Sequence, residues 1–171
     1  MASSLSLILG GAASGKSAFA EKCVLDQGGT PTYIATAQAW DDEMRAKIAA
    51  HVAARGDGWT TVEAPLNLPE AIAQSGDAPI LIDCLTLWLT NLMLADHDVD
   101  QATEALIAAL DASPAAITMV SNEVGQGIVP DNALSRQFRD AQGRLNIRMA
   151  TQSTRVAQVI AGLPNVLKGS F

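Results

Sequence analysis

Residues 5–26 read LSLILGGAASGKSAFAEKCVLD, and this stretch decides the fold. Leu5–Leu9 is a short apolar run, which is typical of a buried strand. Lys16–Asp26 has the spacing of a helix, with Ala18, Phe19 and Cys23 on one side. A strand, a glycine-rich loop and a helix in this order indicate the opening unit of a parallel α/β sheet.

The loop between the two elements matches the pattern G-x-x-x-x-G-K-[S/T], which is typical of phosphate binding. Its glycines let backbone amides face a β-phosphate, and the helix start adds a partial positive charge. The lysine reaches the β- and γ-phosphates, and the final serine ligates magnesium. A glycine turn without a ligand is the alternative. The predicted nucleotide-binding residues are Gly10, Gly11, Ala12, Ala13, Ser14, Gly15, Lys16 and Ser17.

Further along the chain, strand and helix patterns alternate, which favours a parallel sheet with helices on both faces. The predicted strands are Pro31–Thr36, Trp59–Glu63 at an edge, Pro79–Asp83, Ala116–Ser121 and Arg155–Ala161. The predicted helices are Asp41–Ala54, Leu68–Gln74, Leu85–Ala95, Val99–Asp111 and Asn132–Ala150. We expect an α/β, P-loop NTPase-like fold, and a single nucleotide-binding domain over residues 1–171, because the chain has no repeat or low-complexity tract.

Composition excludes several classes of protein. The 171 residues carry 11 Lys and Arg against 18 Asp and Glu, a net charge of −7, so nucleic acid is not an expected partner. The most apolar stretch, Ile80–Ala95, is interrupted by polar residues, so no membrane span is expected. Cys23 and Cys84 lack zinc-site spacing and are expected to be reduced, buried thiols of a cytoplasmic protein.

Asp83 ends the wholly apolar run PILID, as a Walker B carboxylate does. We expect it beside the loop that follows the first strand, where it would be the second magnesium ligand after Ser17. The alternative is a carboxylate that caps the following helix.

The remaining polar residues leave more than one interpretation open. No N-K-x-D segment follows Asn122 and Glu123, which disfavours a signalling GTPase. His51, near a helix end, taken alone is more typical of a capping or solvent-facing side chain, and His97 of a solvated loop. The late arginines could form a solvated helix face or close on a phosphate. They are Arg136, Arg139, Arg144, Arg148 and Arg155.

Several segments together are similar to one known family. They are GGAASGKS, YIATAQAWDDEM with His51 and Arg55 after it, LIDCLTLWLTNLM, and SNEVGQGIVPDN leading to Arg136, Phe138-Arg139-Asp140, Gly143 and Asn146. The chain resembles the bifunctional adenosylcobinamide kinase and adenosylcobinamide-phosphate guanylyltransferases of cobalamin biosynthesis, from Leu5 to about Gly162. The DDEM and NEVGxGIVP segments are more specific than the glycine-rich loop.

The resemblance implies two reactions with Mg²⁺. ATP or GTP phosphorylates adenosylcobinamide; GTP then gives GMP to adenosylcobinamide phosphate through a guanylyl-histidine, at the position of His51. A neutral imidazole suits this nucleophilic role. Lys16 would stabilise phosphate charge. Glu63 could accept from guanine, or be an ordinary exposed carboxylate. A homotrimer is also implied. The further nucleotide contacts implied are Ala35, Thr36, Ala37, Val52, Ala53, Ala54, Arg55, Glu63 and Asp83.

Ala13 stands where the family's loop, GGARSGKS, usually has arginine. A charge-assisted contact with phosphate is worth about 1.5 to 3 kcal/mol, so this departure predicts weaker nucleotide binding or the use of another arginine. Asn122 and Glu123 sit in a loop that we assign to the cobinamide side; the alternative is a rigid turn without a ligand. Trp40, Trp59 and Trp88 are expected to pack in the core, the alternatives being a corrin contact or a subunit interface.

Two other functions remain open from the residues. A simple small-molecule kinase would use the glycine-rich loop without His51, and would form no covalent GMP. A nucleotide-dependent regulatory module would bind GTP and a protein partner without acting on cobinamide.

Overall fold

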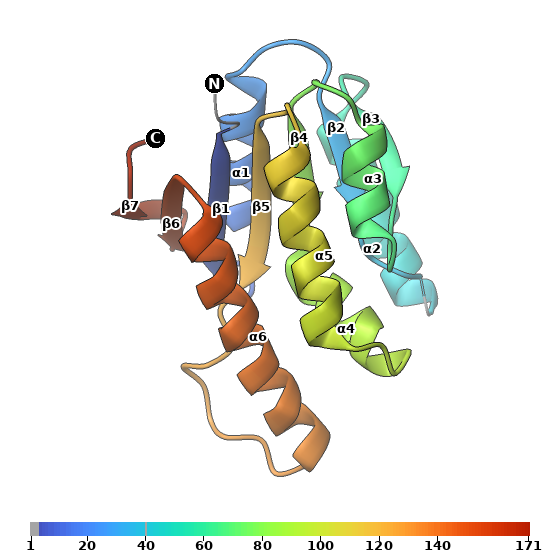
Figure 1. Ribbon diagram of the computed structural model, residues 1–171, viewed down its shortest axis with the longest axis vertical. Helices are drawn as coiled ribbons and strands as arrows, with labels where there is room; N and C mark the ends of the chain where they lie inside the picture. Colours follow the sequence, from blue (N-terminus) through green and yellow to red (C-terminus); the bar gives the residue numbers. More distant parts are fainter. Residues whose placement is uncertain (1–3, 40) are drawn as a thin grey trace.

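The computed structural model describes residues 4–39 and 41–171, apart from the side chains of residues 47, 51 and 54. In these ranges seven strands form one sheet in the order β3-β2-β4-β5-β1-β6-β7, and only β7 runs antiparallel to its neighbour (Figure 1). The strands are β1 (Leu5–Gly10), β2 (Thr32–Ala35), β3 (Thr60–Glu63), β4 (Ile80–Asp83), β5 (Ile117–Asn122), β6 (Arg155–Ile160) and β7 (Leu163–Lys168).

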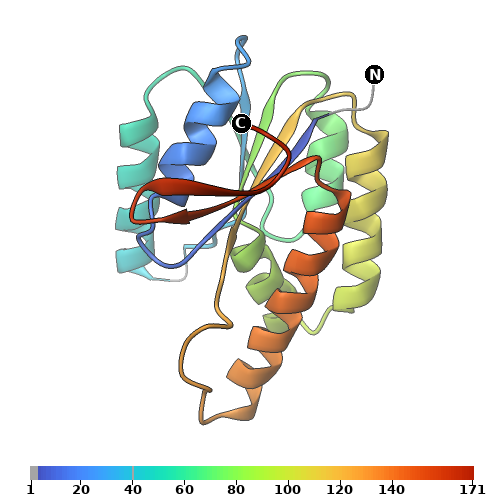
Figure 2. The same cartoon turned by 90° about the vertical axis from the view of Figure 1, so that its left-hand side faces the viewer.

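Helices cover both faces of this sheet, as expected (Figure 2). α1 and α2 lie on one face, and α3 to α6 lie on the other. The helices are α1 (Lys16–Leu25), α2 (Asp42–Arg55), α3 (Leu68–Gln74), α4 (Leu85–Leu94), α5 (Val99–Ala112) and α6 (Ala133–Gln152). The predicted helices and strands up to β6 are confirmed, with bounds that differ by no more than two residues.

The two apolar clusters explain why these residues form a two-faced sheet. Leu7 and Ile8 alternate along β1, so Leu7 packs in the larger cluster under α3 to α6, whereas Ile8 packs against α1. Both are fully buried. Trp88 lies in the larger cluster and Trp59 packs at the border of the smaller one, as expected, while Trp40 lies outside the described residues.

The prediction for the thiols is only half right. Both cysteines are free and Cys84 is buried, but Cys23 is partly exposed. No helix in the described ranges is long and apolar enough to cross a membrane.

β7 was missed by the sequence analysis, which ended the sheet at Arg155–Ala161. All six of its residues are exposed, and its sequence, LPNVLK, does not alternate between apolar and polar residues. The pattern that predicts a half-buried strand is therefore missing. Ala161 and Gly162 both have positive φ, 52° and 78°, which gives the tight two-residue turn of a β-hairpin between β6 and β7. Because β6 is parallel to β1, this turn lies at the same edge of the sheet as the loop that follows β1.

Candidate functional site

The loop after β1 has the backbone of a phosphate cradle. A Cβ at Gly10 would lie 2.4 Å from Ser14 Oγ and 2.9 Å from the backbone oxygen of Val159, so only glycine fits there. Ala13 and Gly15 have φ of 54° and 90°, and Gly15 precedes the first residue of α1 without a side-chain cap. The first amides of α1 are therefore free to bind an anion, as the sequence predicts.

Lys16 lies folded over this loop. Its Nζ donates to Gly11 O at 3.0 Å, so the ammonium sits above the loop that would hold the phosphates. Ser14 Oγ is buried and has no hydrogen-bond partner among the described residues. The loop therefore has a hydroxyl without a partner and a lysine that donates to a carbonyl of the loop itself. Both groups can bind phosphate oxygens.

A cavity of about 570 Å³ opens beside the loop, at the carboxyl ends of β2, β3 and β4. It brings together side chains from α1, β2, α2, β3 and β4, which are far apart in the sequence. The predicted residues in its wall are Ser17, Ala35, Ala37, Val52, Arg55, Glu63 and Asp83. Residues that the sequence analysis did not single out also line it, among them Tyr33, Met44, Arg45, Ile48, Thr61, Pro65 and Leu87.

Some predicted contacts lie elsewhere. Thr36 is fully buried behind the cavity, where its Oγ1 donates to Cys84 O at 2.7 Å and accepts from Cys84 N at 2.8 Å, so its hydroxyl serves the fold. Ala53 is exposed on α2. The side chains of His51 and Ala54 lie outside the described residues, so only their place in α2 is given.

Asp83 ends β4, which is not next to β1 in the sheet. β5 lies between β1 and β4, and Asp83 and Ile8 both pair with Val120, so two strand spacings, about 10 Å, separate them. Asp83 nevertheless reaches the cavity that Ser17 lines. It does not cap α4, since α4 has no side-chain cap.

Tyr33 holds Asp83 in place and is the main residue that sequence reasoning missed. Its hydroxyl donates to Asp83 Oδ2 at 2.7 Å. Burial, together with the Asp83 carboxylate, raises the pKa of Tyr33 far above its ordinary value. The signal was present in the sequence, because a tyrosine in a buried strand needs a partner for its hydroxyl.

Arg55 stacks on the same ring. Its Cζ lies 3.3 Å from the Tyr33 ring centroid, Nη2 donates to Thr61 Oγ1 at 3.4 Å, and Nε is buried without a hydrogen-bond partner among the described residues. Trp59 contacts Tyr33 edge-on at 6.0 Å between centroids. A guanidinium with spare donors in the cavity wall can bind phosphate or guanine oxygens.

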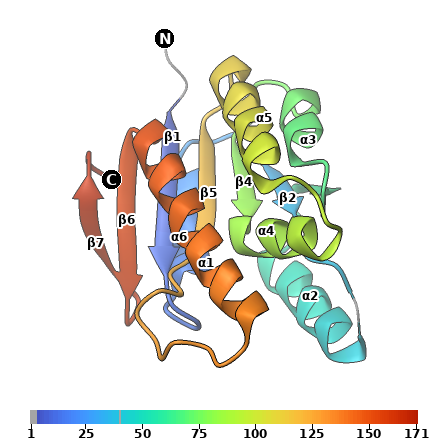
Figure 3. The same ribbon diagram turned by 60° about the horizontal axis from the view of Figure 1, so that its bottom comes forward.

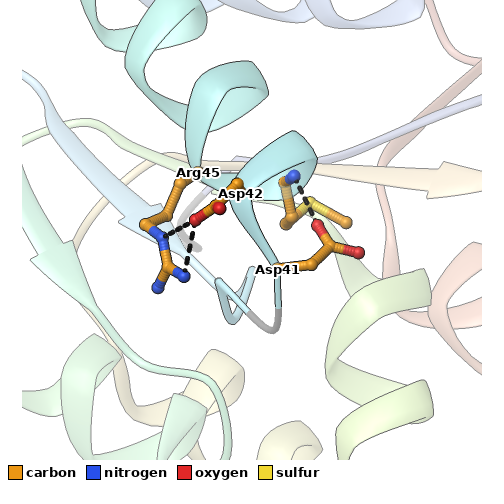
Figure 4. A network of polar contacts seen from close by, with 4 residues as sticks. Asp41, Asp42 and Arg45 are labelled. Carbon is orange, nitrogen blue, oxygen red and sulfur yellow. Dashed lines mark hydrogen bonds and ion pairs between the residues drawn. The ribbon is translucent and has the colours of Figure 1, made fainter.

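The helix α2 begins at a well-formed cap (Figure 4). Asp41 Oδ1 accepts from Met44 N at 2.7 Å, and Arg45 donates to Asp42 Oδ1 through Nε at 3.2 Å and Nη2 at 2.9 Å. The acidic first turn also suits the helix dipole. The DDE segment therefore sets where α2 starts, and α2 carries position 51.

Buried donors on α4 hold the opposite wall of the cavity. Asn91 Nδ2 donates to Thr36 O at 2.8 Å and to Pro65 O at 2.9 Å. Trp88 Nε1 donates to Leu66 O at 3.0 Å. These bonds tie α4 to two segments of the cavity wall. One segment follows β2 and contains Ala37; the other follows Glu63 at the end of β3.

The predicted magnesium ligands fit a nucleotide-bound ion. Ser17 and Asp83 line one cavity, and the second oxygen of Asp83 is not used by Tyr33. No cluster of three or more His, Cys, Asp or Glu suited to a metal occurs in the described part of the chain. Mg²⁺ is commonly held by one or two protein oxygens together with substrate phosphates and water, which is what these residues offer.

A second cavity of about 290 Å³ lies on the other side of the loop after β1. Glu123 lines it with Gly11 and Gln158. Asn122 ends β5 level with Gly10, its N–H bound to Thr86 Oγ1 at 2.8 Å. Asn122 is thus the last residue of a strand rather than part of the loop.

Four of the five late arginines bind protein groups, and none of the five lines the larger cavity. Arg136 donates to Pro130 O and Asp131 O, and Arg139 to Gly125 O. Arg148 pairs with Glu104, and Arg155 donates to Ser6 Oγ. In this structure their role is to hold loops and helix ends, in line with the alternative of an ordinary helix face.

Comparison with known proteins decides the family. The family described as cobinamide kinase / cobinamide phosphate guanyltransferase matches residues 6–167. This chain belongs to that family. It is 47% identical to the bifunctional adenosylcobalamin biosynthesis protein CobP of Pseudomonas aeruginosa over 95% of this chain and 96% of CobP. It is 39% identical to CobU of Salmonella typhimurium, over 92% and 96% of the two chains.

Solved structures support the fold alone. The flagellar accessory protein FlaH from Methanocaldococcus jannaschii matches 99% of this chain and 82% of its own, with a TM-score of 0.54 at 14% identity. A second solved structure, an ATPase domain, matches 91% of this chain and 68% of its own, with a TM-score of 0.51 at 11% identity. The predicted α/β, P-loop NTPase-like fold of this cobinamide kinase / guanyltransferase family member is thereby confirmed.

Proposed function

We propose that this chain phosphorylates adenosylcobinamide with ATP or GTP, and then transfers GMP from GTP to adenosylcobinamide phosphate through a guanylyl group on His51. One observation carries the proposal: a single cavity is lined by Ser17 of the phosphate loop, by Asp83 and by α2, the helix that includes position 51. Family membership favours this function over a simple kinase or a regulatory module.

The spacing along α2 supports His51 as the carrier. Ile48 and Arg55 line the cavity, and position 51 comes three residues after the first and four before the second. Residues three and four apart share a helix face. A histidine at this position can meet a nucleotide whose phosphates rest on the loop after β1.

Guanylyl transfer proceeds in two displacements at the α-phosphorus. A neutral imidazole nitrogen of His51 attacks the α-phosphorus of GTP, a P–N bond forms, and pyrophosphate leaves with the electrons of the bridging P–O bond. The phosphate of adenosylcobinamide phosphate then attacks the same phosphorus, and the P–N bond breaks. Lys16 and the α1 amides stabilise the phosphate charge in both displacements. Bound Mg²⁺, held by Ser17 and Asp83, would supply further neutralisation of that charge.

We propose that guanine is recognised where the cavity is lined by the end of β3. Glu63 lines it at the end of β3, and a carboxylate can accept from guanine N1 and N2. Arg55 offers donors nearby for guanine O6 or for phosphate. The carboxylate and the guanidinium here therefore support GTP as the guanylyl donor.

The test is covalent labelling. The protein is incubated with Mg²⁺ and GTP labelled at the α-phosphate, denatured, and assayed for retained label. We expect an acid-labile, base-stable label on the wild type and none on His51→Ala. His97→Ala is the matched control, because His97 is the other histidine and is exposed beyond α4. Label on His51→Ala, or none on the wild type that still binds GTP, would overturn the covalent mechanism.

The resemblance also supports a homotrimer, and the two free cysteines support a reducing, cytoplasmic location. We therefore propose a homotrimer in a reducing, cytoplasmic compartment.

A further inference from the structure

Two cavities flank the loop after β1, and they share no residue. The larger holds Ser17 and the α2 face. The smaller, about 290 Å³, is lined by Gly11 from the loop, by Gln158 of β6 and by the segment after β5. A nucleotide on this loop can therefore be approached from two sides, and the proposed function needs two groups that attack it: an imidazole at the α-phosphorus and a hydroxyl at the γ-phosphorus.

The smaller cavity adjoins the lysine that would hold the transferred phosphate. Lys16 Nζ donates to Gly11 O, and Gly11 belongs to the cavity wall. In a phosphate loop of this type the lysine contacts the β- and γ-phosphates. The γ-phosphate is thus expected at the mouth of the smaller cavity, whereas α2 faces the larger one.

Glu123 is the one carboxylate among the described residues that line the smaller cavity. Its backbone N–H donates to Gly10 O at 3.0 Å, which ties it directly to the start of the phosphate loop. Its side chain is aimed by two amides: Oε1 accepts from Gly125 N at 2.8 Å and Oε2 from Gln126 N at 3.3 Å. Carboxylate oxygens have further lone pairs, so each remains able to accept a proton.

A rigid frame stands behind this carboxylate. Ser121 Oγ donates to Asn146 Oδ1 at 2.6 Å, Gln142 Nε2 donates to Ser121 Oγ at 2.9 Å, and Asn146 Nδ2 donates to Asn122 O at 3.1 Å. Gln142 is fully buried. These bonds join α6 to the end of β5, and so hold the residue just before Glu123.

We infer that Glu123 is the catalytic base of the kinase step and that the smaller cavity admits the hydroxyl-bearing arm of the acceptor. This inference rests on the proposed function. The hydroxyl gives its proton to Glu123 as its oxygen attacks the γ-phosphorus; the new O–P bond forms, the bridging P–O bond breaks, and the nucleoside diphosphate leaves with that electron pair. The proton then passes from Glu123 to water.

The test measures the two half-reactions separately in Glu123→Gln. We expect the kcat for phosphorylation of adenosylcobinamide to fall about 100-fold or more, the range for loss of a general base, with little change in KM. GMP labelling from GTP and GMP transfer to adenosylcobinamide phosphate should stay within about threefold of wild type, since these steps use the larger cavity. Glu123→Asp should recover part of the kinase rate.

Asp131→Asn is the matched control, because it removes a carboxylate from the same segment outside the cavity. It should leave both half-reactions unchanged. Kinase activity of Glu123→Gln near the wild-type rate would overturn the inference, and so would an equal loss of kinase and labelling, which would make Glu123 a support of the whole site. Failure of the wild type to label or phosphorylate would instead overturn the proposed function.

Discussion

Tyr33 shows how one side chain can organise the site. It donates to Asp83, carries the guanidinium of Arg55 on its ring face, and meets Trp59 at its edge. Tyr33 thus positions both the carboxylate that we propose binds Mg²⁺ and the guanidinium that we propose binds the nucleotide. It is also the only tyrosine in the chain, so its ionisation can be observed directly.

The raised pKa of Tyr33 predicts a pH effect with a definite sign. The unfolded chain ionises near the ordinary value of 10, whereas the folded chain keeps the phenol protonated, because burial and Asp83 oppose the charge. The protonated form therefore stabilises the fold below pH 10, and this contribution is lost as pH rises further. Spectroscopic titration should show no tyrosinate until the protein unfolds.

Tyr33→Phe isolates this effect from that of Cys84, whose pKa burial raises to about 11. At neutral pH the free energy of unfolding of the variant should be about 1 kcal/mol below that of the wild type, the usual worth of one hydrogen bond. When the pH is raised above 10, the free energy of unfolding should fall less in the variant than in the wild type. Urea unfolding at several pH values measures both. A folded wild type that forms tyrosinate near pH 10 would contradict the prediction.

The phosphate loop and the β6–β7 hairpin act as one unit. Gly162 N donates to Ser14 O at 2.8 Å, and a Cβ at Gly15 would lie 3.0 Å from the Cα of Gly162. The hairpin turn therefore supports the loop from behind. The hairpin, whose edge strand β7 is exposed along its whole length, thus contributes to the shape of the phosphate loop (Figure 3).

Gly162→Ala tests this support. Its φ of 78° costs a non-glycine residue about 1 kcal/mol, although a Cβ would meet nothing within 4 Å. We expect that loss in urea unfolding, together with a several-fold rise in the Kd for ATP measured by calorimetry. Gly76→Ala, at φ 68° in equally open space, is the control and should lose stability without losing affinity. Equal Kd values for both variants would mean that the turn does not support the loop.

Across the whole molecule, several large apolar side chains are left exposed. Ile128 is 96% exposed, Leu163 72% and Ile147 69%, on the loop before α6, on β7 and on α6. Apolar surface of this kind is often covered by another chain. Because the family resemblance implies a trimer, we expect sedimentation equilibrium to give three times the 17.8 kDa of one chain, and thermal unfolding to depend on protein concentration. A mass of 17.8 kDa at every concentration would contradict the proposed trimer.

The sequence by itself determined which segments form strands and helices along the chain up to β6, and the conformation of the phosphate loop. Both depend on local causes: apolar periodicity for the elements, and glycines at positions where a Cβ or a negative φ is not allowed. It also carried the resemblance that comparison with relatives bore out, because the DDEM and NEVGxGIVP segments are specific at the level of residues.

Only the tertiary structure decided which strands and side chains lie next to one another. Periodicity does not give the order of strands in a sheet, so the insertion of β5 between β1 and β4, and with it the place of Glu123 next to the phosphate loop, could not be read from the chain. The bond from Tyr33 to Asp83 spans 50 residues, and the turn at Gly162 reaches back to Ser14. Such contacts form because packing two faces of one sheet brings distant segments together, and no local pattern records them.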